Sequence, residues 1–204
     1  MSKIPFFYPW VGKNYKTGGL FNRKIMILGE SYYCGEDCKE CGNSEVFDCS
    51  QFANDVIKSY LDVNVERERW MSTFLKFERS LVNHVTSPKE SKAIWDSLIF
   101  YNYLQFAMHG PRQAGTYEQY KASEEPFFYV LEQYQPDLMI VWGTRLWSHL
   151  PGERWEDGQQ LLVDNYPIKN GYYRLTSGKK VRTICVYHPS ASYSWDYWYR
   201  VINQ

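Results

Sequence analysis

Four short apolar runs stand out along the chain, and none of them alternates with polar residues as a half-exposed strand does. They cover residues 24–29, 97–102, 137–143 and 183–187. Strands of a parallel sheet are covered on both faces and therefore read as continuous apolar runs. The pattern predicts an α/β protein in which these four segments are parallel strands.

Between the strands, apolar residues recur at helical spacing. One helix is expected to carry Trp70, Phe74, Phe77 and Leu81 on its buried face, and another is expected over residues 117–134, with Pro126 in its first turn or at a kink. A chain of 204 residues without repeats or linkers suits a single domain, residues 1–204. The expected fold is a three-layer α/β/α domain with a central four-stranded parallel sheet.

Each of the four strands ends in a residue that suits a ligand site. Glu30, Asn102, Gly143 and His188 follow or close the strands in chain order. In open parallel sheets, ligands bind outside the carboxyl ends of the strands. The sequence therefore predicts that Glu30, Asn102 and His188 lie at one edge of the sheet.

Three of these strand ends resemble the motifs of the uracil-DNA glycosylase superfamily. The segments are Gly29-Glu-Ser-Tyr-Tyr33, Asn102, and His188-Pro-Ser-Ala-Ser192, in the order of that superfamily. The chain departs from the best-known branch at Ser31, which replaces an aspartate, at Tyr32, which replaces a proline, and at Ser192, which replaces a leucine wedge. The resemblance implies a uracil-DNA glycosylase-like fold and cleavage of uracil or a related deaminated or damaged base from DNA.

The resemblance assigns a role to each polar residue at the predicted edge. His188 is expected to stabilise the departing base as a neutral hydrogen-bond donor, and Glu30 to orient water or steady the cationic sugar. Asn102 matches the N3 hydrogen and the O4 atom of uracil. The remaining pocket candidates are Gly29, Ser31 and Tyr33, and the candidate DNA contacts are Ser190, Ser192 and Tyr193.

Charge and composition leave a second class of function open. Lys plus Arg and Asp plus Glu each number 23, so the formal net charge is zero, whereas dedicated DNA-binding proteins are more often basic. The alternative to cleavage of single-stranded or damaged duplex DNA is a non-catalytic member of the same fold that binds a free base, a nucleotide or nucleic acid. No apolar run reaches the length of a membrane span, so we expect a cytoplasmic protein without a membrane partner.

Four of the five cysteines fall in one short segment, residues 34–49. Their positions are Cys34, Cys38, Cys41 and Cys49, with the spacing C-x3-C-x2-C-x7-C. Clustered thiols in a cytosolic chain favour metal over disulfides. We expect a structural zinc site that pins the loop after Glu30, with an iron-sulfur cluster as the less favoured alternative. A metal-dependent redox or sensor protein centred on these cysteines is a third possible function.

Overall fold

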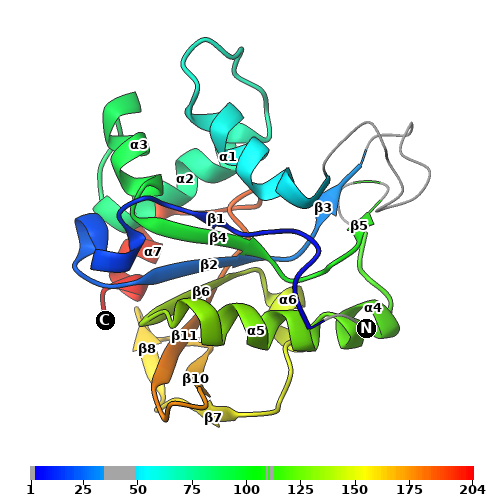
Figure 1. The fold of residues 1–204 in the computed structure, drawn as a ribbon. Helices are drawn as coiled ribbons and strands as arrows, with labels where there is room; N and C mark the ends of the chain where they lie inside the picture. Colours follow the sequence, from blue (N-terminus) through cyan, green and yellow to red (C-terminus); the bar gives the residue numbers. More distant parts are fainter. Residues whose placement is uncertain (1–2, 35–48, 109, 111–112) are drawn as a thin grey trace.

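A computed structural model describes residues 3–34, 49–108, 110 and 113–204. A seven-stranded sheet runs through the molecule, with helices on both of its faces (Figure 1). The strand order is β1-β4-β2-β6-β11-β10-β7. The strands of this sheet are β1 (Trp10–Val11), β2 (Ile25–Gly29), β4 (Leu98–Asn102), β6 (Leu138–Trp142), β7 (Trp155–Asp157), β10 (Asn170–Arg174) and β11 (Lys180–Val186). The mixed α/β class expected from the sequence is confirmed.

The four predicted strands form the parallel middle of the sheet. β2 pairs in parallel with β4 and with β6, and β11 pairs in parallel with β6. The sheet is larger than the expected four strands, because β1, β10 and β7 extend it by antiparallel pairing. The expected four-stranded sheet did not include them, because β1 has two residues, and β10 alternates between buried and more exposed positions instead of forming an apolar run.

Successive residues of the central strands point to opposite faces, and each face has its own core. Ile25 and Ile27 of β2 face α1 (Phe52–Leu61), α2 (Met71–Val82), α3 (Pro88–Trp95) and α7 (Trp195–Ile202). Met26 and Leu28 face α4 (Tyr117–Ala122), α5 (Glu124–Tyr134) and α6 (Thr144–His149). Burial on both faces explains why these strands lack polar residues in their interiors.

The expected helix over residues 117–134 is two helices, α4 and α5, which meet at Ser123. Pro126 lies in the first turn of α5. In a continuous helix its ring would clash with the carbonyl of Ala122, four residues earlier, and one backbone hydrogen bond would be lost. A new helix beginning at Glu124 avoids both costs, which is the first of the two placements expected for this proline.

Smaller elements complete the fold. β3 (Tyr32–Tyr33) pairs in parallel with β5 (Ala107–Met108), and β8 (Leu161–Val163) forms a hairpin with β9 (Tyr166–Ile168). Short 3₁₀ helices occupy Tyr15–Thr17, Gly19–Phe21 and Cys49–Gln51. None of the helices in the described ranges is long and apolar enough to cross a membrane.

A fully buried carboxyl group, that of Glu78, ties α2 to α3. It accepts hydrogen bonds from Ser91 Oγ at 2.6 Å, from Trp95 Nε1 at 3.0 Å and from Thr86 Oγ1. α2 also carries Phe74 and Phe77, whose rings pack against Trp142 at the end of β6. Glu78 therefore helps to fix the aromatic layer beneath the carboxyl edge of the sheet.

We predict that Glu78→Ala lowers the free energy of unfolding by about 3 kcal/mol, because the Ser91 hydroxyl and the Trp95 indole would lose their acceptor inside the core. Urea denaturation measures the change. Glu68→Ala, at an exposed position before α2, is the control and is expected to stay within about 0.5 kcal/mol of the unmutated protein. Equal stabilities of the two variants would contradict the proposed anchoring role.

Candidate functional site

Strand register brings three of the predicted site residues to one edge of the sheet. Gly29, the last residue of β2, lies opposite Asn102, the last residue of β4, and Glu30 follows directly. Val186 lies opposite Trp142, and His188 is two residues further along the chain. The strands are parallel, so Glu30, Asn102 and His188 all sit at the carboxyl edge, as expected from the sequence.

Gly29 lets the Asn102 side chain lie over the β2 backbone. A Cβ atom at position 29 would come within 2.0 Å of Asn102 Oδ1, closer than non-bonded atoms approach. The Asn102 side chain is held there by Nδ2, which donates to the Ser31 carbonyl at 2.9 Å, and the residue is 5% exposed. One of its two amide hydrogens is thus used inside the protein.

Glu30 is held by two partners that sequence reasoning missed. Arg145 Nε donates to Glu30 Oε1 at 2.8 Å and Arg145 Nη2 donates to Oε2 at 2.7 Å, while the Tyr120 hydroxyl also donates to Oε1. The Glu30 side chain is 11% exposed and that of Arg145 is 40% exposed. The pair places a balanced positive and negative charge at the carboxyl edge.

The hydrogen bond and charge of Glu30 raise the pKa of Arg145, and burial followed by the bond to Glu30 raises the pKa of Tyr120. Both groups therefore keep their protons at neutral pH. Arg145 lies in the first turn of α6, where the helix dipole disfavours a cation. That unfavourable position was the one local signal that Arg145 has a special partner.

His188 is held as a neutral imidazole with its proton on Nε2. The Ser190 backbone N–H donates to Nδ1 at 3.2 Å, and the Ser190 hydroxyl lies 2.8 Å from the same nitrogen. Nδ1 is therefore the acceptor and Nε2 carries the hydrogen. Burial and the nearby charge of Arg145 lower the pKa of His188, and Glu30 opposes them, with burial the largest effect.

Among the buried polar atoms without a hydrogen-bond partner in the described residues are the Trp142 indole nitrogen and the Ser31 hydroxyl. The Trp142 ring stands edge to face with His188, with centroids 5.8 Å apart, and also packs against Phe100. A buried donor without an acceptor is costly. Both atoms are covered by protein, so neither is exposed to solvent at this edge.

The remaining predicted contacts differ in their placement. Tyr33 is 42% exposed, and Ser190 and Ser192 lie on the exposed loop after His188. Tyr193 belongs to the core, because it stacks on Trp198 and its hydroxyl bonds Ser80 Oγ at 2.8 Å. The Tyr193 side chain is therefore turned into the core and does not lie on the loop that the sequence predicted to face DNA. We do not count Tyr193 among the candidate DNA contacts.

The four-cysteine cluster is only partly described. Cys34 follows β3 and Cys49 begins the 3₁₀ helix before α1, whereas Cys38 and Cys41 lie outside the described residues. Within the described residues, no group of three or more His, Cys, Asp or Glu side chains is arranged to hold a metal ion. The zinc site, the iron-sulfur alternative and the sensor function stay predictions.

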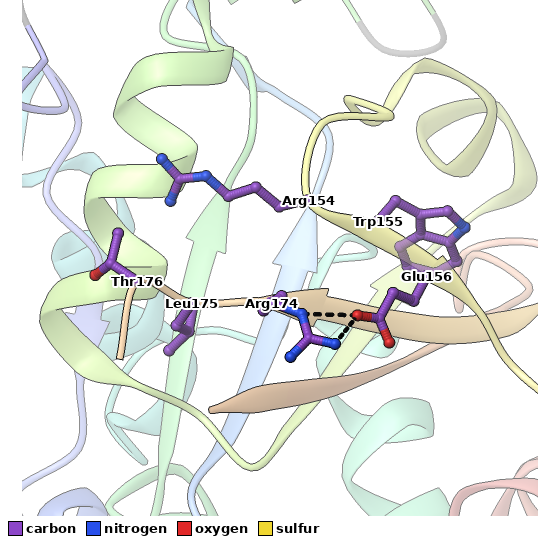
Figure 2. Close-up of a pocket in the computed structure, with 6 residues that line it drawn as sticks. All are labelled: Arg154, Trp155, Glu156, Arg174, Leu175 and Thr176. Carbon is purple, nitrogen blue, oxygen red and sulfur yellow. Dashed lines mark hydrogen bonds and ion pairs between the residues drawn. The ribbon is translucent and has the colours of Figure 1, made fainter. Parts of the chain in front are cut away.

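A surface depression lies between β7 and the end of β10, beside the start of β11 and away from the carboxyl edge (Figure 2). Its lining residues are Arg154, Trp155, Glu156, Arg174, Leu175 and Thr176. Arg174 pairs with Glu156, as Figure 2 shows, and Arg154 pairs with Glu132 at 2.9 Å. Its charges are thus already compensated, so we place the candidate site at the carboxyl edge.

The charges around His188 predict how its pKa responds to mutation. Glu30→Gln removes a negative charge and is expected to lower the pKa further, whereas Arg145→Gln removes a positive charge and is expected to raise it. NMR titration of the histidine ring protons measures both shifts, with the exposed His84 as an internal control. A His188 pKa that is the same in all three proteins would show that these charges lie too far away to matter.

No protein-family model matches the chain, and a search of curated proteins found no match either. The features that bear on function are therefore the geometry of the carboxyl edge and the motif resemblance carried by Gly29–Tyr33, Asn102 and His188–Ser192.

Proposed function

We propose that this protein is a DNA glycosylase-like hydrolase that acts on uracil or a related deaminated or damaged base. The observation that carries the proposal is His188, a neutral Nε2–H donor on the same edge as Asn102 and Glu30. We further propose that the four parallel strands and their helices form a uracil-DNA glycosylase-like layout, to which β1, β7 and β10 are added.

Cleavage of an N-glycosidic bond leaves the bonding electron pair on the base and builds positive charge on the sugar. A hydrogen bond from His188 Nε2 to a base carbonyl would stabilise the leaving anion without transferring a proton. Water then adds to C1′ of the sugar, and its proton is lost to solvent or to the departing base. A neutral, preoriented imidazole suits this role, because protonation would cost energy at this partly buried position.

The carboxyl edge also offers a way to read the base. Asn102 has an oxygen acceptor and one amide hydrogen beyond the hydrogen used by Ser31. The acceptor and the donor of Asn102 favour a base that presents a ring N–H beside a carbonyl group, such as uracil, over one that presents an exocyclic amine.

A second candidate function is binding of a base, nucleotide or nucleic acid without cleavage. The specific observation that favours it is the two-pronged hydrogen bonding of Glu30 by Arg145. A carboxylate neutralised in this way stabilises a cationic sugar less well, and Ser31 supplies no charge in place of the aspartate seen in the best-known branch. The two candidates differ only in whether the bond is broken, so a cleavage assay separates them.

The first functional prediction concerns His188. We expect the protein to release uracil from single-stranded DNA, and His188→Ala to raise the barrier by about 3 kcal/mol, the cost of a lost oxyanion donor. Single-turnover cleavage of a uracil-containing oligonucleotide is the measurement. His84→Ala, at an exposed histidine that bonds Glu90, is the matched control and should cleave at the unmutated rate. Binding of the oligonucleotide without any base release would support the second candidate.

The second functional prediction uses the Glu30–Arg145 pair. If charge on Glu30 steadies the sugar cation, Glu30→Gln should raise the barrier by about 1–3 kcal/mol, the interaction of two unit charges about 6–16 Å apart at an effective dielectric constant of about 20. Arg145→Gln uncovers the carboxylate, so its single-turnover rate should stay equal or rise. Slower cleavage by the arginine variant than by the glutamate variant would contradict this role for Glu30.

A further inference from the structure

Two arginines near the amino ends of the parallel strands have no acidic partner among the described residues. Arg23 lies two residues before Ile25, the first residue of β2, and Arg182 lies in β11. Both residues are half-buried, yet neither side chain forms a salt bridge or a hydrogen bond within the described part of the chain. A cation that is partly withdrawn from water needs a counter-charge to offset its lost hydration. These two side chains are therefore candidates for binding an anion.

Strand register places both arginines on the same face of the sheet. β6 lies between β2 and β11, and its residue Leu138 is the register partner of both Ile25 and Arg182. Ile25 and Ile184 belong to one core, on the side of the sheet that α7 covers. Side chains alternate along an extended chain, so Arg23 and Arg182, each two residues before one of these isoleucines, emerge on that side as well. Two strand spacings of about 4.8 Å each separate their backbones, a gap that two arginine side chains can span.

The nearest carboxylate, that of Asp137, is bonded to other groups. Asp137 Oδ1 lies 2.5 Å from Lys179 Nζ, and Oδ2 accepts from the Lys24 backbone N–H at 2.8 Å. Burial and the charge of Arg182 lower the pKa of Arg23, and the charge of Asp137 opposes them. Asp137 thus moderates the repulsion between the two arginines without forming an ion pair with either of them.

The same face carries further cations beside Arg182. In register, Arg182 lies opposite Tyr172 of β10, which in turn lies opposite Glu156 of β7. Glu156 pairs with Arg174, as Figure 2 shows, and also with Lys180 at 2.5 Å. One carboxylate therefore serves two cations, and this row supplies no negative charge for the two arginines. Positive charge is in excess on this part of the sheet.

We infer that Arg23 and Arg182 together bind a phosphate group of an anionic ligand. Guanidinium groups stay protonated and form two parallel hydrogen bonds to phosphate oxygens, so two of them can hold one phosphate from two sides. A phosphate with two negative charges offsets the local excess of positive charge better than a carboxylate, which brings only one. The site lies at the amino ends of the strands, whereas His188 lies beyond the carboxyl ends, so it does not depend on the proposed function.

Isothermal titration calorimetry with inorganic phosphate tests the inference, at constant ionic strength and at mildly alkaline pH, where phosphate is doubly charged. We expect the unmutated protein to bind phosphate, and Arg23→Gln and Arg182→Gln each to weaken binding about tenfold or more, as for the loss of a hydrogen bond to a charged group. Arg182→Lys keeps the charge but loses the fork of donors, so its affinity should lie between those of the glutamine variant and the unmutated protein.

Competition identifies the source of the phosphate. Displacement of inorganic phosphate by glycerol 3-phosphate but not by an oligothymidine would assign a small phosphate ester to the site. Displacement by the oligothymidine as well would show that the arginines also accept a phosphate of a nucleic-acid backbone. Displacement by acetate at the same ionic strength would instead contradict selection of a doubly charged anion and overturn the inference.

Arg69→Gln, at an exposed arginine before α2, is the matched control and should bind phosphate as the unmutated protein does. Without phosphate, Arg23→Gln should melt at the same temperature as the unmutated protein or higher, because one of two like charges is removed. A lower melting temperature would give Arg23 a structural role and overturn the inference. So would failure of the unmutated protein to bind phosphate, or equal binding by the Arg69 and Arg182 variants.

Discussion

Parallel pairing of β2 with both β4 and β6 is the constraint on which the carboxyl edge depends. Because β2 lies between these strands, its last residue sets the spacing between Asn102 on one side and Trp142 on the other. Gly29 is the point of closest approach, since any larger residue would displace Asn102 from its hydrogen bond to Ser31. Glu30 directly follows Gly29 and therefore lies at the carboxyl edge, next to the ends of the two neighbouring strands.

The charges at this edge are balanced in a way that keeps His188 neutral. Glu30 alone would favour a protonated imidazole, and Arg145 alone would disfavour it. Because the two charges lie close together, their opposite effects on the pKa of His188 partly cancel, and burial is the largest effect on that pKa. The same pairing weakens Glu30 as a source of negative charge, which is why cleavage and simple binding of a base remain distinct proposals for one geometry.

Aromatic packing links the core to the carboxyl edge and to the segment that carries His188. On one side, Glu78 fixes α2 against α3, and Phe74 and Phe77 of α2 support Trp142 beneath His188. On the other, Trp198 of α7 supports Tyr187 and stacks with the buried Tyr193. Large rings with few rotatable bonds suit this work, since they cover much area and hold their orientation.

The local sequence pattern determined where the central strands lie and which residues close them. Continuous apolar runs identified β2, β4, β6 and β11, and the residues that close these runs pointed to the carboxyl edge, because burial on both faces leaves a signal in every residue of a strand. Pro126 also indicated that a helix could begin near it, which is where α5 follows α4. The antiparallel strands form no such run, and the expected four-stranded sheet did not include them.

Tertiary structure alone decided what the polar residues contact. Arg145 lies 115 residues from Glu30 and Tyr120 lies 90 residues from it, so no local spacing joins them. Tyr193, next to exposed Ser192 in sequence, is drawn into the core by Trp198 and Ser80. Hydrophobic periodicity reports which side of an element is buried, but a hydrogen bond or ion pair depends on the position of a distant partner, which only the folded chain supplies.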